Sequence, residues 1–201
     1  RLLTSQSEDE VMAISERLNN LNQQRQNIEE TVLFEATNIV EDEIIEKKLN
    51  IMPNSIVVSG EKWHLGVLGI VASRLKEKYY RPSFVISSND GKATGSARSV
   101  SGIDVGKLII DGVNEGILIS GGGHKMAGGF SLDTSKLDEF KQFCNKKIFD
   151  DADNNVLKKI NFYDDIIDSS NINRDLYNLI KLASPYGQGN PEPQFIIKNA
   201  K

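Results

Sequence analysis

The chain is poor in the residues that build disulfides and metal centres. Its 201 residues include one cysteine, Cys144, and two histidines, His64 and His124. A single cysteine excludes an internal disulfide and any CxxC metal site. Two histidines are too few for the carboxylate and histidine cluster with which two-metal enzymes hydrolyse phosphodiesters, and no Walker-type phosphate loop occurs. We therefore expect no metal-binding residues in this chain.

Long apolar runs are also missing. No hydrophobic stretch approaches the ~20 residues that cross a bilayer, and no signal peptide is visible. We expect a cytoplasmic protein without membrane contact, with Cys144 buried in a helix. The first residue is Arg1, and residues 194–198 resemble a strand without partners, so we expect the chain to be part of a longer protein.

Charge is unevenly distributed, although the net charge is only −4. Residues 1–50 hold 5 Lys/Arg and 11 Asp/Glu, residues 51–130 hold 9 and 6, and residues 131–201 hold 10 and 11. The middle segment has the only basic excess, and it contains 14 of the 16 glycines. A local positive field favours an anionic ligand there.

Glycine and proline are absent from residues 1–52. Ser7 and Glu10 have the spacing of a capping box, and apolar residues then recur at helical spacing. This pattern predicts one helix over residues 7–49. Such a helix is roughly 60 Å long at 1.5 Å per residue, which is too long for one small domain. We expect residues 1–50 to connect two domains.

Strand and helix patterns alternate through residues 51–150, which predicts an α/β domain with a mixed, mostly buried sheet. The expected strands cover residues 55–59, 83–88, 92–98 and 128–132, and the expected helices cover 65–79, 105–114 and 135–148. A polar linker is expected over residues 150–155, and most of it belongs to the last segment, residues 151–201. They continue with a strand-like segment at 156–167, a short helix at 173–182 and an irregular segment at 184–193, which holds three prolines and two glycines.

The most informative segment is Ser-Gly-Gly-Gly-His at residues 120–124. Gly121, Gly122 and Gly123 can take positive φ and allow a ligand to approach the main chain closely. Successive N–H groups in such a turn form a concave anion site. His124 adds a donor. We expect a turn that binds a phosphate or phosphodiester, although glycine triplets also occur in plain turns.

Two further segments carry candidate ligands for phosphate. His64 precedes a predicted helix and would lie at its N-terminus beside free N–H groups. Gly66 and Gly69, in the same helix, favour close packing over ligand contact. Ser96, Arg98 and Ser99 combine a guanidinium with hydroxyl donors, which suits phosphate binding. A solvated arginine at a strand end is the alternative.

Five segments resemble the RecJ family of single-strand-specific 5′→3′ DNA exonucleases, in the DHH phosphoesterase superfamily. In chain order they are WHLGVLGIVASRL, YYRPSFVI, GSARS, GGGHKMAGGF and PYGQGNPEP. The resemblance implies that residues 1–50 join two core domains and that residues 51–150 form the DHH-associated domain. Residues 151–201 would then hold a linker and the start of a truncated OB-like domain, which is β-rich.

The resemblance also implies a function in recombination and repair. The parent would use Mn²⁺ or Mg²⁺ bound by a DHH domain that precedes Arg1, and single-stranded DNA would be its substrate. A single-strand-binding protein or a helicase is a further expected partner. His124 would act in catalysis, while Gly121–Gly123, Ser96, Arg98, Ser99 and His64 would bind substrate.

Two other functions fit the residues. The chain can come from another enzyme of the superfamily, one that acts on short RNA or small phosphate diesters. It can also be a non-catalytic module that binds nucleic acid through the glycine segment. The β-rich extension over residues 156–201 favours DNA over the first alternative, and the presence or absence of a DHH domain separates an enzyme from the second.

Overall fold

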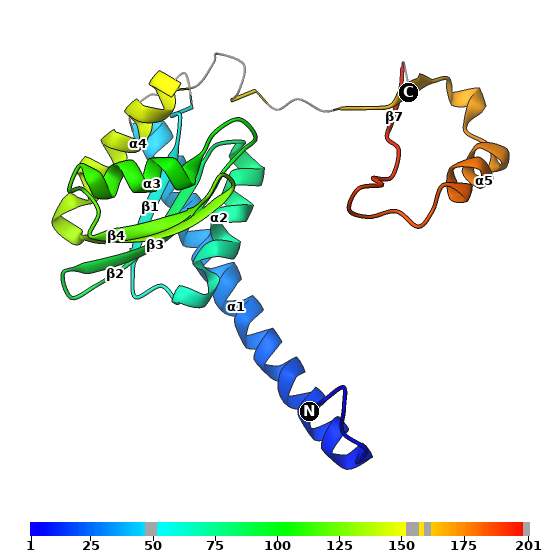
Figure 1. The fold of residues 1–201 in the computed structure, drawn as a ribbon, viewed down its shortest axis with the longest axis horizontal. Coiled ribbons are helices and arrows are strands. Elements are labelled where there is room, and N and C mark those ends of the chain that lie inside the picture. Colours follow the sequence, from blue (N-terminus) through cyan, green and yellow to red (C-terminus); the bar gives the residue numbers. More distant parts are fainter. Residues whose placement is uncertain (47–51, 152–156, 159–161, 199–201) are drawn as a thin grey trace. The chain divides into compact units, whose positions relative to one another are not determined.

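The computed structural model describes residues 1–46, 52–151, 157–158 and 162–198. These residues form two compact units, Arg1–Lys158 and Lys159–Lys201 (Figure 1). Of the predicted linker over residues 150–155, residues 150 and 151 instead end a helix, and residues 152–155 lie outside the described residues.

The first unit begins with the long helix α1, Glu8–Glu46. Ser7 caps it, because its Oγ accepts the N–H of Glu10 at 3.4 Å. The Glu10 carboxylate does not return to Ser7 as a capping box requires; it accepts from the Ser5 hydroxyl at 2.6 Å. Val32, Ala36 and Val40 are buried at a spacing of four residues, so the second half of α1 packs on the domain.

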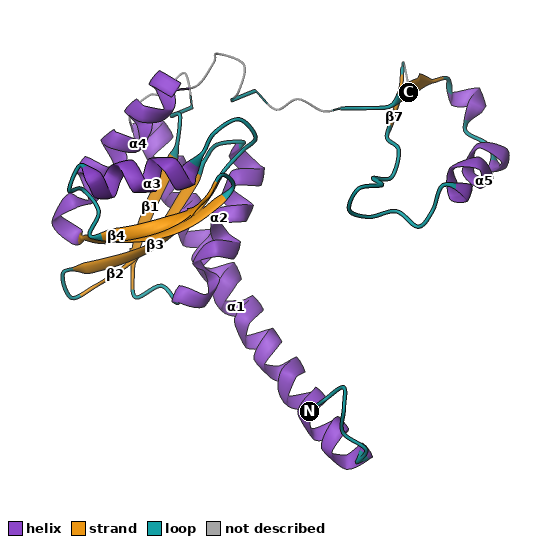
Figure 2. Ribbon diagram, viewed as in Figure 1, coloured by secondary structure: helices purple, strands orange, loops and turns teal. Residues whose placement is uncertain are grey.

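Within the described residues, the first unit contains a five-stranded mixed sheet in the order β1-β2-β3-β5-β4 (Figure 2). The strands are β1 Ile56–Glu61, β2 Ser83–Asn89, β3 Lys92–Arg98, β4 Ser120–His124 and β5 Ala127–Asp133. β1 and β2 are parallel, joined by helix α2, Leu65–Tyr79, and the other neighbours are antiparallel. A two-residue turn with Asp90 and Gly91 at positive φ joins β2 to β3.

Helices cover both faces of the sheet, so alternate residues of a strand enter different cores. Val85 of β2 packs with α1 and α2, whereas Phe84 and Ile86 pack on the other side. That second core contains helix α3, Val105–Asn114, and helix α4, Leu137–Asp151, which follows the 3₁₀ turn Thr134–Lys136. Cys144 of α4 is fully buried there, as expected, and burial raises the pKa of its thiol.

The second unit holds a short parallel pair, β6 Asp165–Ile167 and β7 Phe195–Ile197. Between them lie the 3₁₀ turn Ser169–Asn171 and helix α5, Arg174–Leu182, which Asn173 caps. Residues 184–193 contain no helix or strand, as their prolines and glycines predict.

The predicted fold class is confirmed: a long helix leads into a mixed-sheet α/β domain, and a short β-containing segment follows. None of the helices in the described ranges is long and apolar enough to cross a membrane.

Candidate phosphate-binding face

The Ser120–His124 segment is a strand, not the turn that its glycines predict. β4 pairs with β5 at the edge of the sheet, with Gly121 opposite Phe130 and Gly123 opposite Gly128. Among the described residues, the glycines with positive φ are Gly91, Gly102, Gly116 and Gly189, so the expected left-handed conformation of Gly121–Gly123 is wrong. The glycines instead serve the packing of an extended strand.

Gly121 and Gly123 are needed because their neighbours leave no room for a side chain. A Cβ on Gly121 would lie 2.5 Å from Cγ2 of Ile109, and one on Gly123 would lie 2.3 Å from the carbonyl oxygen of Ala127. Helix α3 approaches from the same side, and a Cβ on its Gly106 would meet the backbone of β4 at 3.0 Å. Gly122 differs, since a Cβ there would point into open space.

The sheet register places the main candidate residues on one face, the face that α2 partly covers. Ser96, Gly129 and Gly122 are aligned across β3, β5 and β4. Arg98, Ala127 and His124 form the next row. We call Ser96, Arg98, Gly122, His124 and Gly129 the glycine face. Strands lie about 4.8 Å apart, so Arg98 and His124 start roughly 10 Å from each other, on either side of Ala127.

Arg98 is half-buried beside α2 and has unused hydrogen-bonding capacity. Its Nη1 lies 2.8 Å from the Ala97 carbonyl oxygen and 3.3 Å from the Ser96 hydroxyl oxygen, and it donates to both. No carboxylate in the described part of the chain lies within salt-bridge distance of Arg98. Gly69 of α2 makes room for the guanidinium, because a Cβ there would lie 2.7 Å from Nη2. A half-buried cation without a counter-ion is suited to an anionic ligand.

His124 ends β4, and its ring is exposed. Nδ1 accepts the N–H of Met126 at 3.4 Å, which leaves Nε2 as the protonated nitrogen of a neutral ring. The turn beneath it is fixed from two sides. The Ser99 N–H donates to the Met126 carbonyl at 2.9 Å, and the Val105 N–H donates to the Lys125 carbonyl at 3.2 Å. A positioned donor therefore faces solvent at the end of the glycine face.

Ser99 lies apart from this face. The residue is 1% exposed, and its hydroxyl donates to the carbonyl of Ile103 at 2.7 Å. A phosphate could reach this hydroxyl only by entering the core and breaking that bond. The prediction that Ser99 contacts substrate phosphate is thus corrected: Ser99 stabilises the loop after β3.

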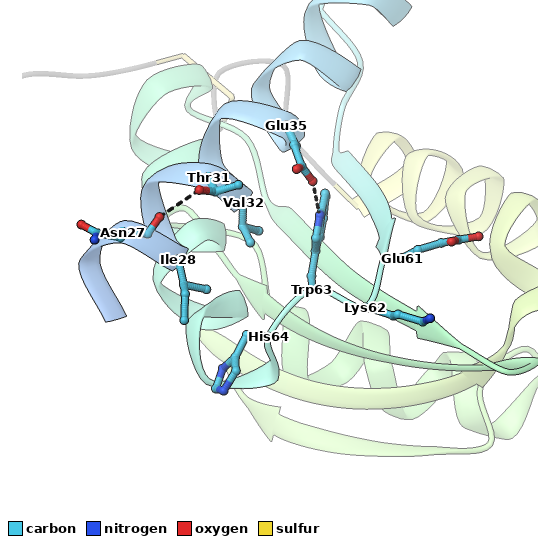
Figure 3. Close-up of a pocket in the computed structure, with 9 residues that line it drawn as sticks. All are labelled: Asn27, Ile28, Thr31, Val32, Glu35, Glu61, Lys62, Trp63 and His64. Atoms are coloured by element: carbon cyan, nitrogen blue, oxygen red, sulfur yellow. Dashed lines mark hydrogen bonds between the residues drawn. The ribbon is translucent and has the colours of Figure 1, made fainter. Parts of the chain in front are cut away.

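His64 caps α2, as predicted, and is exposed. Its Nδ1 accepts the Gly66 N–H at 3.1 Å. It lies in the loop between β1 and α2, outside the rows of the glycine face, beside a pocket of about 490 Å³ against α1 (Figure 3). The neighbouring Trp63 donates from Nε1 to the Glu35 carboxylate at 2.7 Å. Glu35 and Glu61 line this pocket together with one lysine, Lys62, so its acidic side chains outnumber its basic ones and it is a poor site for a polyanion.

Two features of the glycine face were missed in the sequence. Gly129 belongs to its floor, and the Ser120 and Ser131 hydroxyls hydrogen-bond to each other at 2.7 Å on the next row. The alternation of the Ala-Gly-Gly-Phe-Ser segment was the available signal, because alternate residues of a strand share a face. In the described part of the chain, no three His, Cys, Asp or Glu side chains are grouped as metal ligands.

Comparison with known proteins first defines the class of the domain. Residues 53–149 match the DHHA1 domain family, and residues 163–201 match the RecJ OB domain family. The α/β domain that carries the glycine face is therefore similar to DHHA1 domains.

The relatives then identify the particular resemblance. The single-stranded-DNA-specific exonuclease RecJ of Escherichia coli is 30% identical over 96% of this chain, and that of Bacillus subtilis is 29% identical over 99%. The crystal structure of Thermus thermophilus RecJ in complex with Mg²⁺ matches 97% of the chain with a TM-score of 0.77 and 30% identity, and a Mn²⁺ complex also matches. The expected resemblance is confirmed: the chain is RecJ-like along nearly its whole length. It spans 34% and 25% of the two relatives, and 29% of the structure solved with Mg²⁺.

Proposed function

We propose that the chain is the substrate-binding part of a RecJ-type exonuclease that degrades single-stranded DNA from its 5′ end in recombination and repair. The observation that carries this proposal is the glycine face, where Arg98 and His124 lie on either side of Ala127, next to a floor without side chains at Gly122 and Gly129. A DNA backbone can lie against such a floor with donors on both sides of it.

Each part of the face has a role in this proposal. Arg98 and Ser96 bind one phosphate, and that phosphate is the 5′ end when the strand terminates there. Strand β4 has no side chains at Gly121, Gly122 and Gly123. His124 donates from Nε2 to the phosphoryl group under attack. Its contribution grows as negative charge builds on the phosphoryl oxygens, because a preorganised donor needs no reorientation during the reaction. His64 is a secondary contact beyond this face.

The Mg²⁺ or Mn²⁺ of the RecJ structures would be held by a DHH domain in a longer protein, and it would activate the attacking water. The chain's own residues bind and orient the strand and donate to the developing charge. We further propose that this protein works in the cytoplasm and meets its DNA through a single-strand-binding protein or a helicase.

Binding measurements on the chain test this proposal. We expect a 5′-phosphorylated single-stranded DNA to bind more tightly than duplex DNA or a two-nucleotide RNA of the same end chemistry. Stronger binding of the short RNA would favour the other superfamily enzymes, which act on short RNA or small diesters. The match of residues 163–201 to the RecJ OB domain supports DNA.

A further inference from the structure

A groove of about 810 Å³ lies between the loop after β1 and the β2–β3 hairpin, outside the glycine face. Lys62, His64 and Leu65 line it from the loop and from the first turn of α2. Lys92 and Thr94 line it from β3. We call these five residues the lysine groove.

Strand β3 connects the lysine groove to the glycine face. Alternate residues of a strand share a face, so Lys92, Thr94, Ser96 and Arg98 lie on the same side of the sheet. Arg98 follows Lys92 by six positions, which is about 20 Å at ~3.4 Å per residue. A stacked strand of nucleic acid covers that distance with about six nucleotides at ~3.4 Å each, and an extended strand needs fewer.

The loop that carries Lys62 is firmly attached to β2. The Lys62 N–H donates to the Ser88 carbonyl at 3.0 Å, and the Ser87 hydroxyl donates to the Trp63 carbonyl at 2.7 Å. Figure 3 shows the Trp63 ring directed toward Glu35 of α1, while the side chains of Lys62 and His64 leave the loop in other directions. The two exposed side chains are thus presented from a fixed backbone.

The charges of the groove suit a phosphate chain. Lys62 and Lys92 have no carboxylate within salt-bridge distance among the residues with described positions, and Asp90 is the acidic side chain that lines the groove. His64 adds its Nε2–H, since its Nδ1 is an acceptor for Gly66. Leu65 is 60% exposed and offers an apolar contact for a base.

We propose that the lysine groove is a second binding site for the backbone of the same single-stranded DNA, several nucleotides away from the phosphate at Arg98. With the 5′ end at Arg98, the DNA passes the phosphate site at His124 and continues toward Lys92 and Lys62. This site rests on the proposed function, because it extends the substrate of the glycine face. It makes binding depend on the length of the strand.

Length-dependent binding to the 201-residue chain tests the proposal. The probes are fluorescent dT12 and an unlabelled 5′-phosphorylated dT2, which competes with dT12 but is too short to reach both sites. Lys62→Ala/Lys92→Ala should raise the Kd of dT12 several-fold and lower its slope of log K against log salt by about 1.4, or about 0.7 for each lost phosphate contact. The inhibition constant of dT2 should stay unchanged.

A matched variant separates a local contact from a general loss of positive charge. Lys107 and Lys146 are exposed on α3 and α4, which cover the opposite face of the sheet. Lys107→Ala/Lys146→Ala removes the same charge and should leave dT12 binding close to that of the unchanged chain. Circular dichroism should be identical for all variants, because the four lysines are exposed.

Three results would overturn the second site. The first is an unchanged slope of log K against log salt for dT12 in Lys62→Ala/Lys92→Ala. The second is a loss of dT2 binding in that variant as large as its loss of dT12 binding. The third is an equally large effect of Lys107→Ala/Lys146→Ala on dT12 binding. Arg98→Ala distinguishes this failure from failure of the proposed function. If Arg98→Ala weakens dT2 while the lysine variant leaves dT12 unchanged, the glycine face stands and the lysine groove is rejected. If the chain binds neither oligonucleotide, both proposals fall.

Discussion

Arg98 is the residue whose surroundings point most directly to an anion. Its guanidinium is half-buried, Gly69 leaves space for it, and no acidic side chain in the described ranges neutralises it. A structural arginine in such a position normally has a carboxylate partner, because an unpaired buried charge is costly. The missing partner is therefore expected to come with the ligand.

The first prediction concerns the salt dependence of Arg98. Arg98→Ala should weaken binding of 5′-phosphorylated single-stranded DNA and reduce the slope of log K against log salt by about 0.7, because one phosphate contact is lost. Fluorescence anisotropy over a range of salt concentrations measures both quantities. Arg74→Ala is the control, since Arg74 is exposed on α2 and faces Glu29 at 3.6 Å. An unchanged slope for Arg98→Ala would reassign Arg98 to a solvated or structural role.

The second prediction concerns His124 in the full-length protein with its metal-binding domain. His124→Ala should lower kcat by ~10²–10³, the loss seen when one preorganised donor is removed, while KM changes much less. We expect the glycine floor to bind the ground state without the imidazole, so affinity should be largely kept. Steady-state kinetics on 5′-phosphorylated single-stranded DNA give both constants.

His64→Ala is the matched control for His124, because both rings are exposed and both accept a backbone N–H at Nδ1. It should leave kcat nearly unchanged and raise KM, because we assign His64 to DNA binding in the lysine groove. A raised KM with normal kcat in His124→Ala would make His124 a plain binding residue.

At the scale of the elements, β4 forms because of its contacts with neighbouring elements, although its own composition disfavours a strand. Glycine is a poor strand former, and three glycines in a row predict a turn. The strand forms because β5 supplies its ladder partners and because α3 packs against the bare backbone through Gly106. Neither contact is visible in the segment itself, so local sequence reasoning predicted the wrong conformation for this segment.

Other elements were predictable because pattern and packing agree. The bounds predicted for α2, α3 and β3 are those of the structure. Ser99 is the opposite case. Its hydroxyl has the same chemistry as that of Ser96, and only the strand alternation and the loop bond to Ile103 reveal that it points inward. A residue's type suggests a ligand, but the face on which it lies decides whether the ligand can reach it.

The third prediction separates the two uses of glycine in β4. Gly121→Ala should destabilise the fold by about 1–3 kcal/mol, because its Cβ would overlap Ile109 and the Phe130 Cβ, at 2.5 and 2.9 Å. Gly122→Ala should unfold at nearly the same urea concentration as the unchanged chain, because its Cβ points into open space, yet it should bind DNA more weakly. Urea unfolding and DNA titration of both variants provide the comparison. Normal DNA binding by a folded Gly122→Ala chain would show that the floor is not a contact surface.

At the scale of the whole molecule, α1 extends the first unit well beyond its sheet (Figure 1). Its buried residues Val32, Ala36 and Val40 lie in the second half, and Met12, Leu18 and Leu21 in the first half are exposed. A helix with apolar residues on an uncovered half is suited to a second domain. The length of the helix led us to predict that residues 1–50 connect two domains, and we propose that the exposed apolar residues of its first half contact the second domain. The Glu35–Trp63 hydrogen bond fixes the helix to the loop that carries Lys62 and His64.

The last prediction follows from the division of labour that we propose between two domains. The 201-residue chain should bind single-stranded DNA but release no nucleotides from it, because its glycine face supplies donors and its proposed metal-binding partner domain is separate. Incubation of the chain with 5′-phosphorylated single-stranded DNA and Mn²⁺, followed by product analysis, measures this. The His124→Ala chain serves as the contamination control, since a contaminating nuclease would act equally in both preparations. Digestion that survives repurification and is lost in His124→Ala would mean that the chain holds a complete catalytic centre, and the assignment of its residues to binding and charge stabilisation alone would then fail.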